Sequence, residues 1–379
     1  MKEVCVLGST GSIGLQTLSV LKENDNSFSL VGISCHSNAD IIYQQTKEFK
    51  PRFVAIDIIE KDHPLKDLCS NNNIELIIGE NSSSILASKI KADLVLNAIV
   101  GTSGLEPTFN IINNGIDLAI SNKESLVLAG HIIMPLAKKK NVNIIPVDSE
   151  HSAIYQCMIG EKKESVEKII LTGSGGPFLK RDLSTFKSIL PEEALKHPNW
   201  DMGKKISIDS ATMMNKALEL IEAMWLFDIS YEEIDIVIHP QSIVHSMVYF
   251  KDGSYKAHLG VPDMKVPILY ALTFPNRSSS NVGSLDFKSL NLSFEKPESE
   301  RYPVLGLSEK LIKDGGNRVA VMSIANDYIV QQFLDKKINF EDMFTTLVDT
   351  VKRFENDSSP SIEELITLDK NIRLYFNSK

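Results

Sequence analysis

The 379-residue sequence has few cysteines, no long apolar run and no long basic run. Its cysteines (Cys5, Cys35, Cys69 and Cys157) lie far apart without a CxxC pair, which argues against a disulfide framework or a cysteine metal site. Such thiols are typical of the cytosol, so we expect a cytoplasmic protein. No apolar run approaches the roughly 18 residues of a membrane span, and no charged and apolar leader precedes the first apolar run. We therefore expect no membrane span and no targeting segment.

Basic residues are also outnumbered, with 40 Lys and Arg against 49 Asp and Glu and a formal charge of -9. Nucleic acids and anionic membranes usually bind basic surfaces, so we expect neither as a partner. A net-acidic chain can still bind a small phosphate ester through one local basic site. The length is sufficient for two or three globular domains.

Short apolar runs alternate with helical patterns through the first 150 residues. The predicted strands are residues 4–7, 28–34, 53–57, 74–78, 93–98, 116–120 and 143–147. This alternation predicts an α/β fold with a Rossmann-like parallel sheet covered by helices on both faces. We assign residues 1–150 to this domain. Ligands of such sheets bind at the carboxyl ends of the strands.

The first predicted strand leads into the sequence GSTGSIG, residues 8–14. Glycines at Gly8, Gly11 and Gly14 permit a tight turn and let the backbone approach a pyrophosphate at the start of the next helix. The spacing is GxxGxxG rather than GxGxxG, so a glycine-rich turn without a ligand remains the alternative. Its position in the first βα unit favours a dinucleotide.

No acidic residue follows the second predicted strand directly; the turn contains His36, Ser37 and Asn38. An NAD site usually places Asp or Glu here to bind the ribose. The nearest acid is Asp40, which we interpret as a helix cap. The missing carboxylate leaves room for a 2′-phosphate and favours NADP over NAD.

Two later strand ends are polar. Asn122, Lys123 and Glu124 follow residues 116–120, and Asp148, Ser149 and Glu150 follow residues 143–147. If the last strand continues, Asp148 and Glu150 project to the same side. Converging carboxylates require a cation or a proton between them, so a divalent metal site is one interpretation. An ordinary surface pair is the other.

Beyond residue 150 the alternation stops. The predicted strands are residues 166–172, 234–238, 245–250 and 255–259. They indicate an α+β domain over residues 151–280, in which the turn 173–177 contains Ser174 and suits an oxyanion. Residues 281–304 have the composition of a linker. Helical patterns at 318–334, 340–354 and 361–368 predict a C-terminal helical bundle over residues 305–379.

Residues 209–227 are predicted to form one helix with Asp209 or Ser210 as its N-cap. At 3.6 residues per turn, one arc of roughly 100° carries Thr212, Asn215, Lys216 and Glu219. A solvated helix face is the alternative to a binding face.

The preceding loop, His197–Gly203, carries Trp200 and Met202 without an obvious core to receive them. We expect this loop to be a lid that is mobile without ligand and leaves Trp200 partly exposed. A permanently packed Trp200 is the alternative.

Together these motifs resemble one family. The segments GSTGSIG, NKESLV, PVDSEH, LTGSGGPF, HPNWDMG and SIDSATMMNKALELIEA are similar, in order and over nearly the whole chain, to 1-deoxy-D-xylulose 5-phosphate reductoisomerases. The resemblance implies a homodimer with the domains given above. It also implies rearrangement of 1-deoxy-D-xylulose 5-phosphate, by retro-aldol cleavage and re-aldolisation, and reduction to 2-C-methyl-D-erythritol 4-phosphate with NADPH and a divalent metal, for isoprenoid synthesis.

The resemblance also implies the role of each site residue. The metal ligands, for Mg²⁺, Mn²⁺ or Co²⁺, are Asp148, Glu150 and Glu219. The substrate contacts are Lys123, Ser149, Glu150, Ser174, His197, Ser210, Asn215, Lys216 and Glu219. The cofactor contacts are Gly8, Thr10, Gly11, Ser12, Ile13, Gly14, Asn122, Glu124 and Gly203. The catalytic set is Lys123, Glu150, His197 and Trp200, with Glu150 as proton acceptor and Lys123 stabilising oxyanion charge.

One position departs from the family pattern, because similar enzymes often have Lys where this chain has Ser37. We therefore expect His36, Ser37 and Asn38 to hold the 2′-phosphate.

Two other classes of protein share some of these motifs. An NADP-dependent sugar-phosphate or semialdehyde dehydrogenase without isomerisation has no need of three carboxylates. A non-catalytic NADP-sensing protein has no use for Lys123 or for the 197–203 loop. A requirement for metal distinguishes a reductoisomerase from the first class. Turnover of NADPH with 1-deoxy-D-xylulose 5-phosphate distinguishes it from the second.

Overall fold

The computed structural model describes residues 1–200, 202–354 and 359–378. The chain forms two compact units. The first unit comprises Met1–Ser125, His131–Asp148 and Met264–Asn281. The second unit comprises Leu126–Gly130, Ser149–Asp263 and Val282–Lys379.

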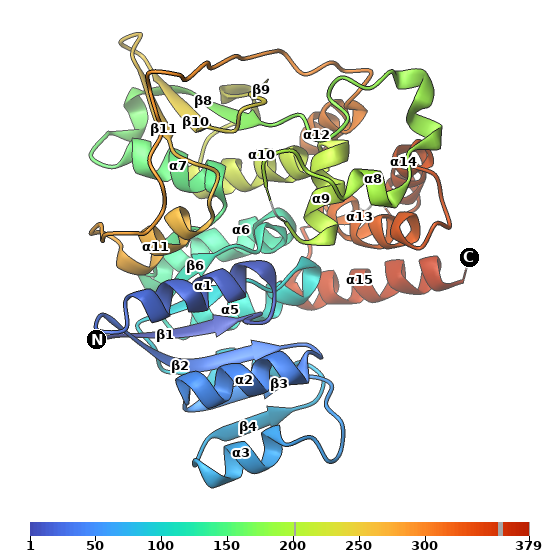
Figure 1. Cartoon of the computed structure of the whole chain (residues 1–379). Coiled ribbons are helices and arrows are strands. Elements are labelled where there is room, and N and C mark those ends of the chain that lie inside the picture. Colours follow the sequence, from blue (N-terminus) through green and yellow to red (C-terminus); the bar gives the residue numbers. More distant parts are fainter. Residues whose placement is uncertain (201, 355–358, 379) are drawn as a thin grey trace. The chain divides into compact units, whose positions relative to one another are not determined.

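The first unit contains a seven-stranded parallel sheet with the order β4-β3-β2-β1-β5-β6-β7 (Figure 1). Its strands are β1 Lys2–Leu7, β2 Phe28–Cys35, β3 Phe53–Ile56, β4 Glu75–Ile78, β5 Leu94–Asn97, β6 Asp117–Ile120 and β7 Ile144–Pro146. The helices of this part of the chain are α1 Ser12–Glu23, α2 Ala39–Phe49, α3 Leu65–Asn71, α4 Ser82–Lys89, η1 Gly101–Gly104, α5 Leu105–Asn113 and α6 Lys123–Lys140. The predicted strands are all present within two residues, which confirms the Rossmann-like fold.

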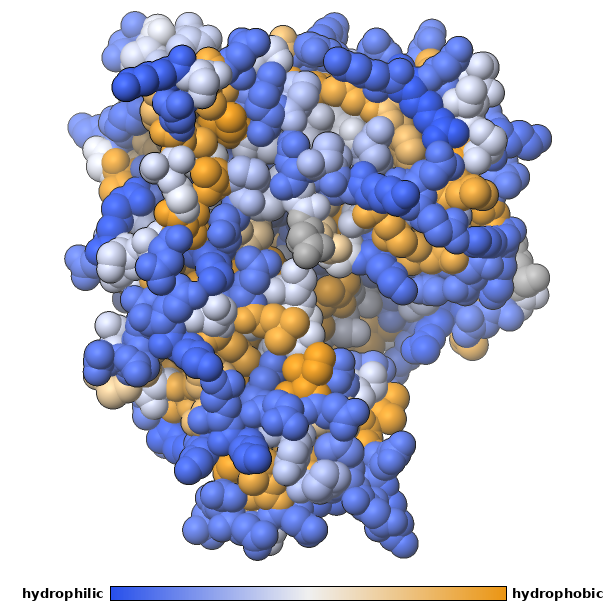
Figure 2. All heavy atoms as spheres, in the orientation of Figure 1, coloured by the Kyte–Doolittle hydropathy of each residue, from blue (hydrophilic) through white to orange (hydrophobic). Residues whose placement is uncertain are grey.

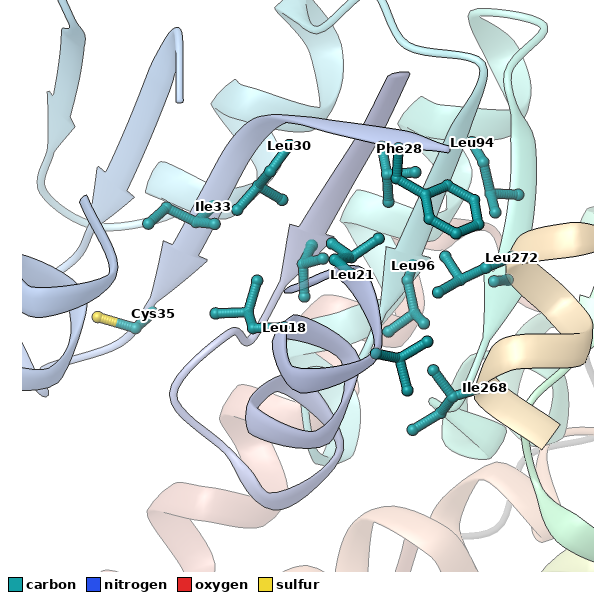
Figure 3. Close-up of a cluster of buried hydrophobic side chains, with 14 of the residues drawn as sticks. Leu18, Leu21, Phe28, Leu30, Ile33, Cys35, Leu94, Leu96, Ile268 and Leu272 are labelled. Atoms are coloured by element: carbon teal, nitrogen blue, oxygen red, sulfur yellow. The ribbon is translucent and has the colours of Figure 1, made fainter. Parts of the chain in front are cut away.

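The strands are apolar on both faces because helices cover both sides of the sheet. Consecutive residues Val4, Cys5, Val6 and Leu7 are all fully buried, a pattern typical of a doubly covered parallel strand. Figure 3 shows part of this core, in which side chains of α1, β2 and β5 pack together with Ile268 and Leu272. These two residues belong to α11, Lys265–Thr273, so a helix from late in the chain completes the core of the first unit.

The second unit is built on a four-stranded mixed sheet with the order β11-β10-β8-β9. Its strands are β8 Val166–Gly173, β9 Ile234–Ile238, β10 Val244–Phe250 and β11 Tyr255–Leu259. β10 runs antiparallel to β8 and β11, and a turn that contains Asp252 and Gly253 joins β10 to β11. The helices and 3-10 segments before β11 are α7 Ser149–Met158, η2 Lys163–Ser165, η3 Leu183–Ser188, α8 Pro191–Ala194, α9 Lys204–Thr212, α10 Met214–Phe227 and η4 Tyr231–Glu233. α7 and α10 pack against this sheet.

The C-terminal part is helical, as predicted. It contains α12 Pro303–Asp314, α13 Arg318–Leu334, α14 Asp342–Phe354 and α15 Ile362–Asn377. The last helix is longer than the predicted segment 361–368, and Ser361 caps it by accepting a hydrogen bond from the Glu364 backbone. Between α11 and α12 the described residues form no helix or strand, apart from a bridge between Ile238 and Glu295.

The prediction of a single helix over residues 209–227 is wrong. α9 ends at Thr212, Met213 has a φ of 60°, and α10 begins at Met214. Asp209 is therefore not an N-cap; it lies inside α9 and is 2% exposed. A left-handed residue without glycine or asparagine carries no sequence signal, which explains the error.

On the face of the molecule drawn in Figure 2, hydrophilic residues predominate and hydrophobic residues show in separate patches between them. None of the helices in the described part of the chain is both long enough and apolar enough to span a bilayer.

The glycine-rich loop generates a prediction about stability. A Cβ atom on Gly14 would lie 2.3 Å from the carbonyl oxygen of Gly8, whereas on Gly11 its nearest neighbour would be 3.4 Å away. We expect Gly14→Ala to lower the free energy of unfolding by about 1–3 kcal/mol through overpacking, and Gly11→Ala to cost less than about 1 kcal/mol. Thermal unfolding of both variants measures this difference. Equal midpoints would show that the close approach has no energetic consequence.

Candidate active site

The loop between β1 and α1 lies at the point where the strand order of the first unit reverses, between β1 and β5. Gly8 has a φ of +78°, and a Cβ there would approach the carbonyl oxygen of Ala98 to 2.7 Å. Gly11 is the N-cap of α1 and, like Ser12, is exposed. Open backbone N–H groups at a helix start, at a switch point of a parallel sheet, suit a pyrophosphate.

The turn after β2 brings His36 beside the carboxylate of Asp57, the residue that directly follows β3. His36 Nδ1 lies 2.9 Å from Asp57 Oδ2, and the His36 side chain is 71% exposed. The other Asp57 oxygen accepts hydrogen bonds from the Ser82 backbone at 3.0 Å and from the Ser82 hydroxyl at 2.7 Å. Asp57 belongs to none of the predicted motifs, because no local pattern signals that the ends of β2 and β3 meet.

The cap of α2 differs from the prediction. Asn38 is the N-cap, and its side-chain oxygen accepts a hydrogen bond from the Ile41 backbone at 3.2 Å. Asp40 lies in the first turn of α2 instead, with Oδ1 3.4 Å from His63 Nε2. The interpretation of Asp40 as a cap is therefore wrong.

Asn122 links the ends of neighbouring strands. Its amide nitrogen donates to the carbonyl oxygens of Ile99 at 2.8 Å and Gly101 at 2.9 Å, and to Glu124 Oε2 at 3.1 Å. Its side-chain oxygen caps α6 by accepting from the Ser125 backbone. Asn122 and Glu124 thus shape the segment that follows β5.

Lys123, the first residue of α6, lies beside Asp148. Its Nζ is 2.5 Å from Asp148 Oδ2, and the two side chains are 7% and 12% exposed. The predicted strand 143–147 does not continue to Glu150, so the condition for Asp148 and Glu150 to project together from one strand is not met: β7 ends at Pro146, and α7 begins at Ser149. Glu150 lies in the first turn of α7, where the helix dipole favours a negative charge.

In the second unit Lys216 joins two carboxylates from different helices. Its Nζ lies 2.8 Å from Glu150 Oε1 and 2.5 Å from Glu219 Oε2. Asn215 donates to the second oxygen of Glu219, and Ser149 donates to Glu150 at 2.5 Å. Lys216 is 3% exposed and Glu219 is fully buried. The alternative that this helix face is solvated is therefore wrong.

Electrostatics within this group are set by the two acids. Burial alone lowers the pKa of Lys216, but the carboxylates of Glu150 and Glu219 outweigh it and raise the pKa above its ordinary value. Oxygen atoms of the two carboxylates lie within 4.8 Å of one another. Thr212, expected on the same arc, lies on α9 instead, and its hydroxyl donates to the Ile208 carbonyl.

The predicted oxyanion turn follows β8 and contacts His197. Ser174 Oγ lies 2.9 Å from His197 Nε2. His197 Nδ1 accepts hydrogen bonds from the backbone N–H groups of Asn199 at 3.2 Å and Trp200 at 3.0 Å. Nε2 therefore carries the proton and donates to Ser174. Burial lowers the pKa of His197 to about 4, although Glu150 opposes this shift, so the ring is neutral at pH 7.

Ser210 meets the same turn through its backbone. A Cβ on Gly176 would lie 2.7 Å from the carbonyl oxygen of Ser210, and a Cβ on Gly173 would lie 3.1 Å from Lys216 Cε. Both glycines permit this close packing of β8 and its turn against α9 and α10. Ser174, Ser210 and Lys216 thus come from three elements in direct contact.

Asn199 anchors the loop before α9 to the segment after β9. Asn199 Nδ2 donates to the Pro240 carbonyl at 2.6 Å and to Ser242 Oγ at 2.8 Å. Trp200 is half-buried, with its ring 6.0 Å from that of His245, which confirms the expected partial exposure. Gly203 is exposed at the N-cap of α9, and Asp201 lies outside the described residues. Mobility of the loop stays a prediction.

His239 has a structural role, since its Nδ1 lies 2.8 Å from the Ser293 carbonyl and its Nε2 accepts from the Ile243 backbone. His245, in contrast, lies beside Trp200 and packs against the candidate lid. The sequence missed this contact and that of Asn199, because both join distant segments.

Three sequence models of one family match the chain. The model of 1-deoxy-D-xylulose 5-phosphate reductoisomerase matches residues 4–130, that of its C-terminal domain residues 144–227, and that of the DXP reductoisomerase C-terminal domain residues 259–375. A 1-deoxy-D-xylulose 5-phosphate reductoisomerase of Chloroherpeton thalassium is 44% identical over 380 residues, covering 100% of this chain and 98% of that protein. One of Chlorobaculum tepidum is 45% identical over 371 residues, covering 98% and 97%.

Solved structures agree with these matches. A 1-deoxy-D-xylulose 5-phosphate reductoisomerase from Zymomonas mobilis in complex with NADPH has a TM-score of 0.91 at 38% identity, with 100% of this chain and 98% of that one covered. A DOX-P reductoisomerase in complex with NADPH, fosmidomycin and magnesium has a TM-score of 0.93 at 36% identity and the same coverage. The chain belongs to the 1-deoxy-D-xylulose 5-phosphate reductoisomerase family.

Proposed function

We propose that this protein rearranges and reduces 1-deoxy-D-xylulose 5-phosphate to 2-C-methyl-D-erythritol 4-phosphate with NADPH and a divalent metal. The observation that carries the proposal is the group of Glu150 with the buried Lys216 and Glu219 beside the Ser174–His197 pair. A dehydrogenase without isomerisation has no need of this group. The relative solved with NADPH, fosmidomycin and magnesium supports the same cofactors.

The donor set suits a hard cation. Glu150 and Glu219 offer carboxylate oxygens within 4.8 Å of each other, and Asp148 stands two residues before Glu150 in the chain. Lys216 neutralises only one of the two charges of Glu150 and Glu219. These three carboxylates would hold Mg²⁺ or Mn²⁺, which when bound polarises the carbonyl and hydroxyl oxygens of the substrate.

The neighbouring groups suit a phosphate ester. Ser174, Ser210, Asn215 and Lys216 provide hydroxyl, amide and ammonium donors, and neutral His197 provides an N–H. Ser149 stands beside Glu150, whose carboxylate would accept a substrate hydroxyl proton. Lys123 would stabilise developing oxyanion charge. Trp200 and the rest of the 197–203 loop would close over the bound substrate and exclude water.

The first unit would bind NADPH, the hydride donor. Gly8, Thr10, Gly11, Ser12, Ile13 and Gly14 would hold the pyrophosphate, with Asn122, Glu124 and Gly203 as further contacts. His36, Ser37 and Asn38 would hold the 2′-phosphate. Because Asp57 binds Nδ1 of the exposed His36 ring, Nε2 is directed to the outside, where it can meet a phosphate oxygen.

We further propose a homodimer in the cytoplasm. The four cysteines are buried and unbridged, which suits a reducing compartment. β11 is an edge strand of its sheet, and its residues Tyr255, Lys256 and Ala257 are exposed, so it offers a surface for a second copy.

The activity is tested by following NADPH oxidation at 340 nm and the phosphorus NMR spectrum of the product. We expect oxidation with 1-deoxy-D-xylulose 5-phosphate plus Mg²⁺ or Mn²⁺, and none after chelation. Oxidation that continues at full rate without metal would favour a simple dehydrogenase and contradict the proposal.

Cofactor preference is tested by comparing kcat/KM for NADPH and NADH. We expect NADPH to be preferred, and His36→Ala to reduce the preference by up to about tenfold if it removes a charge-assisted hydrogen bond. His63→Ala is the matched control, since it removes another imidazole that faces a carboxylate in the same unit. An equal change in both variants would exclude a specific role for His36.

The protonation state of His197 is tested by NMR of the ring nitrogens. We expect Nε2 to remain protonated and Nδ1 unprotonated at pH 7, with titration near pH 4. Because the unfolded ring takes up its proton near pH 6.5, folding stability from this residue is lost as the pH falls from 6.5 towards 4. A midpoint at or above 6.5 would contradict the assigned hydrogen bonds.

A further inference from the structure

Two buried hydrogen bonds tie the C-terminal part of the chain to the elements that carry Ser174 and Ser210. Tyr302, directly before α12, donates its hydroxyl to the carbonyl oxygen of Gly175 at 2.8 Å. Asn326, on α13, donates its amide to Asp209 Oδ1 at 2.7 Å. Tyr302 and Asp209 are 2% exposed and Asn326 is 3% exposed. Neither Tyr302 nor Asn326 belongs to a motif that the sequence indicated.

The Tyr302 bond fixes the one carbonyl of this turn that lies between its contacts with His197 and with α9. Gly175 and Gly176 have φ values of +81° and +68° and no side chains with which to pack. The Gly175 carbonyl lies between Ser174, whose hydroxyl faces His197, and Gly176, which touches the backbone of Ser210. A shift of this carbonyl therefore moves Ser174 relative to α9. Burial raises the pKa of Tyr302 to about 12, so its hydroxyl remains a donor.

The Asn326 bond fixes the helix that carries Ser210. Asp209 directly precedes Ser210 and points the other way, into α13. Its second oxygen lies 3.1 Å from Lys205 Nζ, which also lies 3.1 Å from Asp327 Oδ1. Asn326 and Asp327, which are adjacent on α13, thus contact Asp209 and Lys205, which lie one turn apart on α9. A buried carboxylate deprived of such partners is strongly destabilised, so α9 is held in this register.

We propose that Tyr302 and Asn326 are positioning residues for the substrate phosphate. They set the spacing between the Ser174 turn and Ser210 without touching the substrate themselves. The inference rests on the proposed function, in which both serines donate to the phosphate. Two donors on separate elements bind one phosphate well only at a defined spacing, and a displacement of about 1 Å is costly.

The test uses the full-length enzyme with NADPH and Mg²⁺. Tyr302→Phe removes a single oxygen atom, and Tyr328→Phe is its matched control, since Tyr328 donates to Asp369 Oδ1 at 3.1 Å in the same helical part. We expect Tyr302→Phe to raise KM for 1-deoxy-D-xylulose 5-phosphate about three- to tenfold, the loss typical of one hydrogen bond, with KM for NADPH unchanged. Tyr328→Phe should change neither. Asn326→Ala should act like Tyr302→Phe.

Coupling provides a readout that general destabilisation does not reproduce. In a Ser174→Ala background, Tyr302→Phe should raise KM for 1-deoxy-D-xylulose 5-phosphate by a smaller factor than it does alone, because it acts through the same donor. Full additivity, an equal rise in KM for NADPH, or an equal effect of Tyr328→Phe would overturn the inference. If Ser174→Ala and Ser210→Ala raise KM but Tyr302→Phe and Asn326→Ala do not, the inference fails and the phosphate site stands. If neither serine variant raises KM, the phosphate site fails as well.

Discussion

The structure of the second unit depends on one buried ammonium group. Lys216 lies between Glu150, from the first turn of α7, and Glu219, one turn further along α10. Without the ammonium, two nearby carboxylates repel each other; without the carboxylates, the charge of Lys216 is buried and uncompensated. His151 adds a second link between the same helices, because its Nε2 lies 2.9 Å from the Glu219 carbonyl. The site and the packing of α7 on α10 therefore depend on the same contacts.

The hydrogen-bond donors near Lys216 and its two carboxylates are held in place by different parts of the chain. His197 reaches Ser174 from the loop before α9, where burial keeps its ring neutral and two backbone N–H groups donate to Nδ1. The C-terminal part holds the turn after β8 through Tyr302 and holds α9 through Asn326. A helical region that contributes no predicted contact residue to the site can in this way determine how well the site binds phosphate.

The strands, helices and helix faces that depend on local periodicity could be predicted from the sequence. Apolar runs located the strands of both sheets, and the helical pattern at 318–334 matches α13. The 3.6-residue repeat placed Asn215, Lys216 and Glu219 on one face. Contacts between distant segments could not be predicted: Asp57 beside His36, or the return of α11 to the first unit. The left-handed Met213 also escaped prediction, because no glycine or asparagine marks that position in the sequence.

The proposed chemistry requires that the carboxylates of Glu150 and Glu219 bind a hard divalent cation. Electron paramagnetic resonance of free Mn²⁺, titrated with the enzyme at neutral pH, measures this directly and without turnover. We expect one bound ion per chain in the native protein, and strongly weakened binding in Glu219→Gln. The exposed-residue variant Glu164→Gln should bind Mn²⁺ like the native protein. Undiminished binding in Glu219→Gln would contradict the account.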